Sequence, residues 1–126
     1  MPTIMFQGRF AESVVDGTKR NTIRKVRKKN PIKVGDVLSH RQWSGTRAYE
    51  PGSTQIVLRV ETCTRVTPIR IQERRCKLGT IWIDGMWREL LAKKDGFDDW
   101  KSLVAWFTET HGLPFEGVFI EWSITE

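Results

Sequence analysis

The sequence contains little cysteine and little histidine, and neither residue occurs in a metal-binding pattern. The two cysteines, Cys63 and Cys76, are far apart and form no Cys-x-x-Cys motif. The two histidines, His40 and His111, match no zinc-ligand spacing. We therefore expect no metal site and no other cofactor, and we interpret the two thiols as reduced and buried.

Long apolar runs are also absent. No stretch approaches the roughly 20 residues that a helix needs to cross a bilayer, and the N-terminus has no apolar signal-peptide segment. These absences argue against a membrane protein and against export, so the sequence predicts a cytoplasmic protein. Its 126 residues, 39% hydrophobic and 29% charged, are typical of a single globular domain that spans residues 1–126.

Positive charge is concentrated in the first third of the chain. Residues 1–47 hold 11 Lys or Arg and three Asp or Glu, a net charge of +8, within a total of +6. Residues 84–126 hold four Lys or Arg and nine Asp or Glu, a net charge of −5. A basic region of this kind indicates either a surface that faces a polyanion or a face that only improves solubility.

Hydrophobic periodicity predicts an α+β fold. Strands are expected at 3–6, 37–43, 55–66, 76–84 and 118–124, and a loop at 18–24 is expected to lead into another strand. Helices are expected at 9–17, ended by Gly17, and at 98–111, capped by Asp98 or Asp99. A loop is expected at 44–53, a short turn or a one-turn helix at 68–72, and a hairpin turn at Asp84-Gly85. The sum, five or six strands and two or three helices, predicts a small barrel.

The segment 16–24, with the sequence Asp-Gly-Thr-Lys-Arg-Asn-Thr-Ile-Arg, is the main candidate for a functional loop. It is polar, and only Ile23 has an obvious place in a core. Because a helix is expected to end at its start, the loop would be held rigidly, which suits reactive side chains. We interpret it as the floor of a pocket for a nucleobase or nucleoside, with Lys19, Thr22 and Arg24 as the functional side chains.

Several short motifs follow one another along the chain. They are Arg9-Phe10, Gly17-x-Lys19-x-x-Thr22-Ile23-Arg24, Val34-Gly35-Asp36-Val37-Leu38, Asp95-Gly96-Phe97, an aromatic helix through Trp106-Phe107, Gly112, and Phe119-Ile120-Glu121-Trp122. Together they resemble the ASCH domain family, a branch of the PUA-like superfamily, over essentially the whole chain. The resemblance implies a PUA-like mixed β-barrel with a cleft beneath the first helix, and a protein that binds RNA or a nucleoside.

The resemblance also implies an activity. Small bacterial members of the family are amidohydrolases that convert N4-acetylcytidine to cytidine and acetate, using a Lys base, a Thr nucleophile and a Glu. Matched by motif, these roles fall on Lys19, Thr22 and Asp95, an Asp where the family has Glu, while Asp84 and Glu89 are nearby alternatives. The chemistry is consistent, because a threonine hydroxyl needs a neighbouring base. A lysine can be that base when burial or nearby cations lower its pKa.

Four further residues are candidates for substrate binding. Arg24 could hold a carboxylate or stabilise an oxyanion, Arg9 belongs to the first motif, and Trp43 and Trp122 could stack on a base. Structural roles compete at each position. Lys19 could be a solvated loop lysine, Asp95 a capping residue, and the tryptophans core residues.

Two alternatives to the amidohydrolase follow from the same residues. In a non-catalytic RNA-binding module, the basic run from Arg24 to Lys33 would contact phosphates and aromatic side chains would contact bases. In a ribonuclease, Lys19 and Arg24 would supply the general base and the cation. The sequence does not indicate an oligomeric state.

Overall fold

The computed structural model describes residues 1–44 and 54–124, which form an α+β fold. The strands are β1 (Thr3–Met5), β2 (Asn21–Arg24), β3 (Val37–Trp43), β4 (Gln55–Ile71), β5 (Cys76–Leu78), β6 (Ile81–Ile83) and β7 (Phe115–Trp122). The helices are α1 (Gly8–Asp16), α2 (Gly85–Lys94) and α3 (Trp100–Thr110). The α+β class is therefore confirmed. The loop expected at 44–53 lies, apart from Ser44, outside the described residues.

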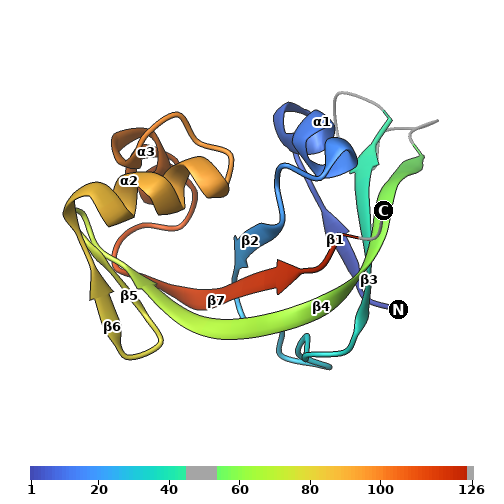
Figure 1. Ribbon diagram of the computed structural model, residues 1–126, viewed down its shortest axis with the longest axis horizontal. Coiled ribbons are helices and arrows are strands. Elements are labelled where there is room, and N and C mark those ends of the chain that lie inside the picture. The colour runs from blue at the N-terminus through green and yellow to red at the C-terminus, as the bar shows by residue number, and fades with distance from the viewer. Residues whose placement is uncertain (45–53, 125–126) are drawn as a thin grey trace.

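The long strand β4 organises the sheet (Figure 1). Its first half pairs antiparallel with β3, and its second half pairs antiparallel with β7 and β5. Beyond these neighbours, β1 runs parallel to β3, β6 pairs with β5, and β2 pairs with β7. Because β4 curves strongly, α2 and α3 lie over one end of the sheet and α1 over the other.

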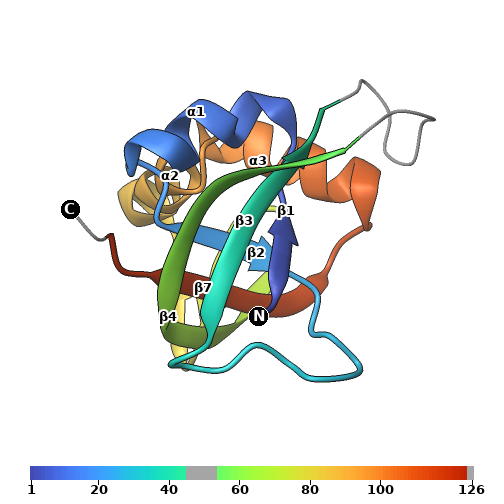
Figure 2. The same ribbon diagram turned by 90° about the vertical axis from the view of Figure 1, so that its right-hand side faces the viewer.

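The described strands form a mixed sheet of seven that is not closed. β1 and β2 face each other but do not pair, and we call the gap between them the seam (Figure 2). Two arginines bridge it, since Arg24 Nη2 donates to Met5 O at 2.7 Å and Arg27 Nη2 donates to Thr3 O. The expected barrel of five or six strands is thus corrected to an open sheet of seven.

Four local predictions were wrong. The loop expected at 18–24 becomes strand β2 from Asn21 onward. The turn expected at 68–72 is the end of β4, because Ile69 is buried there and pairs with β5. The strand expected at 76–84 is the β5–β6 hairpin, which turns at Gly79 with a φ of 63°. The hairpin turn expected at Asp84-Gly85 is the start of α2, a helix that the periodicity did not predict.

The core lies between the sheet and the helices. Its fully buried side chains include Val14 of α1, Leu103 and Phe107 of α3, and Leu38, Ile71 and Ile120 of the sheet. The expected helix ends are confirmed, since Gly17 takes a φ of 83° after α1 and Asp99 caps α3 by accepting from the Ser102 N–H at 2.7 Å. No helix in the described part of the chain is long and apolar enough to cross a membrane.

Candidate functional site

Local hydrogen bonds fix the loop between α1 and β2. Asp16 Oδ1 accepts hydrogen bonds from the N–H and the hydroxyl of Thr18, at 2.8 and 2.7 Å. The Lys19 N–H donates to Ser13 O at 2.9 Å, which ties the loop to the last turn of α1. The backbone around Lys19 is therefore set by α1, as the sequence predicted for a rigidly held loop.

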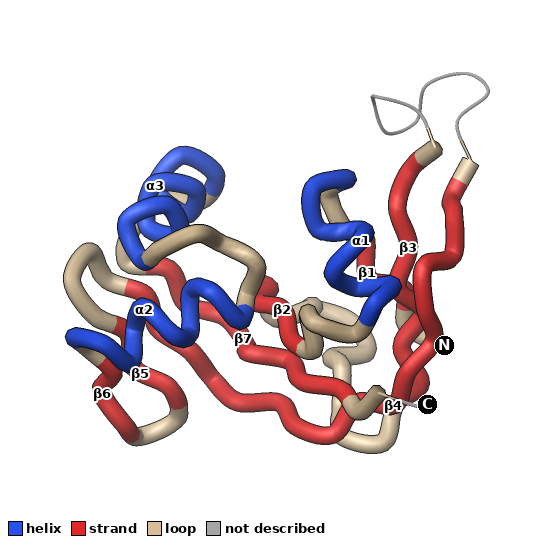
Figure 3. The backbone as a smooth tube through the Cα atoms, turned by 45° about the horizontal axis from the view of Figure 1, so that its top comes forward, coloured by secondary structure: helices blue, strands red, loops and turns tan. Residues whose placement is uncertain are grey.

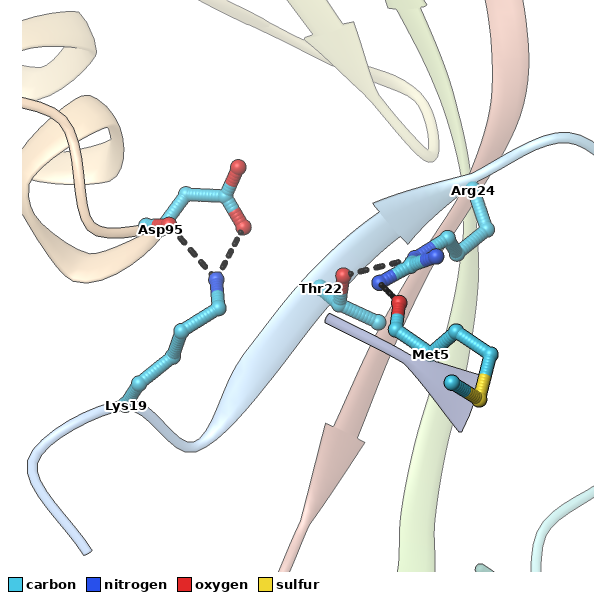
Figure 4. A network of polar contacts seen from close by, with 5 residues as sticks. All are labelled: Met5, Lys19, Thr22, Arg24 and Asp95. Carbon is cyan, nitrogen blue, oxygen red and sulfur yellow. Dashed lines mark hydrogen bonds and ion pairs between the residues drawn. The ribbon is translucent and has the colours of Figure 1, made fainter. Parts of the chain in front are cut away.

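Strand β2 presents Thr22 and Arg24 on the same side. Side chains two residues apart in a strand point to the same face. Arg24 Nε donates to Thr22 Oγ1 at 3.0 Å, and the other end of the guanidinium donates to Met5 O (Figure 4). The threonine hydroxyl thus lies against a cation that is itself held in place by β1.

Lys19 and Asp95, 76 residues apart in sequence, form a buried ion pair (Figure 4). Lys19 Nζ lies 2.9 Å from Asp95 Oδ1 and 2.5 Å from the Asp95 carbonyl oxygen. Lys19 is 3% exposed and Asp95 5% exposed, so the interpretation of Lys19 as a solvated loop lysine is wrong. The short Asp side chain reaches Lys19 because the backbone of Asp95 lies against the ammonium as well.

Helix α2 and Gly96 bring Asp95 to this position. Asp95 ends α2, where its N–H donates to Leu91 O at 3.0 Å. Gly96 follows with a φ of 98°, and a Cβ on it would lie 2.7 Å from the ring of Phe10. Only glycine allows both this backbone conformation and the close approach to Phe10. Gly96 is therefore part of the support of the pair.

The two alternative acids lie elsewhere. Asp84 begins α2, at the opposite end of the helix from Asp95. Glu89 accepts a hydrogen bond from the Trp100 N–H at 2.8 Å and so joins α2 to α3. Of the three carboxylates that the sequence offered, Asp95 is the one that the fold brings to Lys19.

A cleft of about 340 Å³ opens beside the ion pair. Lys19, Thr22, Arg24 and Asp95 all line it. Its aromatic lining consists of Phe6, Phe10, Phe97, Trp106, Phe107 and His111. This size is near the lower end of ligand pockets, about 300–1,000 Å³, and the mixture of aromatic walls with a few converging polar groups is typical of them.

Of the three remaining predicted binding residues, one lies beside the cleft and two do not line it. The Arg9 guanidinium lies 4.5 Å from the Phe10 ring and 4.9 Å from the Phe97 ring, which puts it beside the cleft lining. Trp122 is buried, with its ring 4.1 Å from that of His40, and is not among the residues that line the cleft. Trp43, at the end of β3, does not line it either.

The aromatic side chains that do line the cleft were missed by the sequence interpretation. Trp106 and His111 come from α3 and from its C-terminal end, and Phe97 from the segment between α2 and α3. One signal was available, because Trp106 lies beside the buried Phe107 at the edge of the apolar arc of α3. A large aromatic residue at such an edge is well placed to face a cavity.

Burial brings the pKa values of the ion pair closer together. It lowers the pKa of Lys19, an effect opposed by the Asp95 carboxylate and reinforced by Arg24 and by Arg9. It raises the pKa of Asp95, opposed mainly by the Lys19 ammonium. Because desolvation disfavours both ions, moving a proton from Lys19 to Asp95 costs less here than in water. The neutral amine of Lys19 together with the carboxylic acid form of Asp95 is therefore closer in free energy to the ion pair than it is for the same groups in water.

Comparison with known proteins provides no family assignment. No protein-family model, curated protein or solved structure matches the chain. In residues 1–44 and 54–124, no cluster of three or more His, Cys, Asp or Glu is arranged to hold a metal ion.

Proposed function

We propose that this chain is an ASCH-type protein of PUA-like architecture, that it binds a nucleoside or an RNA base in the cleft, and that it deacylates N4-acylated cytidine there. The observation that carries the proposal is the buried Lys19–Asp95 pair beside Thr22. The motif resemblance assigns the reacting groups to two segments far apart in the sequence, with Lys19 and Thr22 in the first and Asp95 in the second. Their meeting around one cavity of suitable size supports these assignments.

In the first step, Thr22 Oγ1 attacks the carbonyl carbon of the substrate amide. The hydroxyl proton passes to the neutral amine of Lys19, which turns from Asp95 toward Thr22. Arg24, already hydrogen-bonded to Thr22 Oγ1, stabilises the negative charge of the tetrahedral intermediate. Asp95, as a carboxylic acid, donates its proton to the amide nitrogen as the C–N bond breaks. The products are cytidine and an acylated Thr22.

In the second step, water hydrolyses the acyl-threonine ester. The Asp95 carboxylate accepts a proton from the attacking water, and the Lys19 ammonium returns a proton to Thr22 Oγ1 as the C–O bond breaks. The carboxylic acid product leaves, and Lys19 and Asp95 are again neutral. In the structure Lys19 and Asp95 form an ion pair, which is the protonation state that the mechanism gives them between the two steps. One proton transfer from Lys19 to Asp95 converts the pair to the form that starts the first step.

Incubation with N4-acetylcytidine, followed by mass spectrometry of cytidine and acetate, tests the proposal. We expect turnover by the native protein, and a loss of about 10²–10⁴-fold in Lys19→Ala, since this substitution removes the general base. Thr22→Val, which keeps the side-chain shape, should lose turnover as well. Lys101→Ala and Thr62→Val, at exposed positions, are the matched controls. Unchanged turnover in Lys19→Ala would overturn the mechanism.

A non-catalytic RNA-binding module is the second candidate, and a hollow next to the cleft favours it. This hollow, about 300 Å³, lies over the seam and shares Met5, Arg24 and Lys25 with the cleft. Arg27 lines it further along the same exposed basic segment. A strand whose base enters the cleft could lay its phosphates along these cations. Binding of RNA without turnover would support this function, and degradation of the RNA would indicate a ribonuclease.

A further inference from the structure

Helix α2 and strand β6 carry an exposed apolar surface at the end of the molecule away from α1 (Figure 3). Its side chains, which we call the α2 face, are Ile81, Trp82, Met86, Trp87 and Leu90. Ile81, Met86 and Trp87 are each about two thirds exposed. A hollow of about 440 Å³ is lined by all residues of the α2 face except Met86. Monomeric soluble proteins rarely expose contiguous apolar patches of more than a few hundred Å². The α2 face therefore indicates a contact with another molecule.

The outward side of α2 is separate from the side that packs on the protein. Leu91 and Ala92 are buried, and Glu89 accepts the hydrogen bond from Trp100. Arg88 donates a hydrogen bond to the backbone carbonyl of Arg74, which lies just before β5. Met86, Trp87 and Leu90 are instead exposed. They do not line the cleft in which we place the chemistry.

We propose that the α2 face is the interface of a homodimer in which the two α2 helices pack antiparallel. Asp84 at the start of α2 and Lys94 at its end both line the hollow. A twofold axis across the middle of α2 places Asp84 next to Lys94 of the partner subunit, and Lys94 next to Asp84 of the partner subunit. A partner surface that carries only positive or only negative charge would instead place a like charge next to either Lys94 or Asp84. The antiparallel arrangement also opposes the two helix dipoles favourably.

The size and charge of the α2 face suit a second copy. A stable interface buries about 800 Å² on each partner, and an aromatic side chain alone can bury about 150–250 Å². The five side chains of the α2 face, which are 39–68% exposed, form the apolar centre of such an interface, and neighbouring polar side chains supply the rest of its area. Helix α2 carries charges of both signs, with Glu89 against Arg88, Lys93 and Lys94, and lies outside the basic region of residues 1–47. Dimerisation through α2 does not bring the two basic regions together.

Sedimentation velocity of the full chain over a concentration series tests the dimer. We expect the native protein to dimerise, and Trp87→Glu to raise the dimer Kd by at least about tenfold, because it buries a charge at the centre of the interface. Val60→Glu, at an exposed apolar position on β4, is the control and should leave dimerisation unchanged. Circular dichroism establishes that both variants fold. A native protein that stays monomeric to about 1 mM, or equal dimerisation in Trp87→Glu, would overturn the proposal.

Charge reversal tests the orientation of the two helices. Asp84→Lys and Lys94→Asp each place like charges at both ends of the interface, so each variant alone should dimerise more weakly. A mixture of the two variants should recover the native affinity as a heterodimer, since opposite charges then meet at both ends. Equal weakness in the mixture and in the separate variants would exclude the antiparallel arrangement. The dimer and this test do not depend on the proposed activity.

Discussion

Two ion pairs of similar length differ greatly in surroundings. Lys19 and Asp95 are 2.9 Å apart with almost no exposure, whereas Arg70 and Glu116 are 2.6 Å apart with side chains 43% and 67% exposed. Water screens the exposed pair, so its net contribution is small. In the buried pair each charge depends on the other, because neither can be hydrated.

We predict that Lys19→Met destabilises the protein by about 3–5 kcal/mol, since it leaves Asp95 as an unpaired buried carboxylate. Lys19→Met/Asp95→Leu should recover most of this stability, because two apolar side chains replace both ions. Arg70→Ala should change the free energy of unfolding by about 0–1 kcal/mol. Urea denaturation measures all three. A double variant as unstable as the single variant would contradict this account.

His40 is a second buried polar residue, and it is held by packing alone. Within the described part of the chain, neither ring nitrogen has a hydrogen-bond partner. The ring lies 5.4 Å from that of Phe6 and 4.1 Å from that of Trp122. Burial lowers the pKa of His40 to about 4, against an opposing effect of Glu61. The folded protein therefore keeps this imidazole neutral.

The pKa of His40 predicts how stability depends on pH. Because the folded-state pKa, about 4, is below the ordinary 6.5, the unfolded chain binds more protons at pH values between the two. His40 therefore destabilises the fold increasingly as pH falls from 6.5 to 4, by on the order of 3 kcal/mol at most. Chemical denaturation across this range should show a shallower pH dependence in His40→Phe than in the native protein. Parallel curves for the two proteins would contradict the prediction.

The elements predicted well from sequence are those whose own periodicity matches their burial. α1 buries Phe10 and Val14 at helical spacing, and α3 buries Trp100, Leu103 and Phe107. α2 was not predicted because its large apolar residues lie on the outside, while only Leu91 and Ala92 are buried. Its pattern does not follow the core, and the dimer that we propose would explain the apolar outer side.

The end of β4 was misread for a different reason. Pro68 has no N–H and is typical of turns, so the sequence indicated that the strand ends before it. In the sheet, Pro68 lies opposite Val118 of β7, and its carbonyl accepts a hydrogen bond from Gly79. Pairing with two neighbouring strands thus overrides the local preference, and a single sequence does not contain that information.

At the site, the sequence predicted the residues that lie in one short motif better than the residues that only tertiary contacts bring to the cleft. Lys19, Thr22 and Arg24 fall within six residues, so the expected loop and strand already bring them together. Asp95 was assigned through the family motif. The aromatic lining was not predicted, because it depends on which side chains of α3 and of the α2–α3 segment the fold brings to the cleft beside β2.

The turn after α2 predicts an effect of Gly96. Gly96→Ala places a Cβ against the Phe10 ring in a backbone conformation unfavourable for alanine. We expect a destabilisation of about 1–3 kcal/mol together with displacement of Asp95, and hence a larger fractional loss of activity than of stability. Gly112→Ala, which also has a positive φ but no atom within 4 Å of the added Cβ, is the control. Thermal unfolding and deacylation assays measure the two effects, and equal behaviour of the variants would contradict the role of Phe10.

For the whole molecule, the open seam joins the cleft to the basic segment. Arg24 lines both the cleft and the hollow over the seam, and Arg27 bridges the seam to β1. Beyond the seam, Lys29 and Lys33 line another surface hollow with Arg27. A closed sheet would separate these regions, whereas the open one places them on one continuous surface. This arrangement supports the second candidate function that we propose, in which an RNA strand runs past the cleft.

The salt dependence of RNA binding tests this surface. For single strands, the slope of log Kobs against log salt concentration is about −0.7 for each neutralised phosphate. Lys25→Ala/Lys29→Ala removes two exposed cations that line the hollows, so the slope should become shallower by about 1.4. Lys93→Ala/Lys101→Ala removes two exposed cations from α2 and α3 and should leave the slope unchanged. If phosphates follow a defined path along the seam, only the first double variant should change the slope. Equal changes of the slope in both double variants would indicate that RNA is attracted by the net charge of the protein alone.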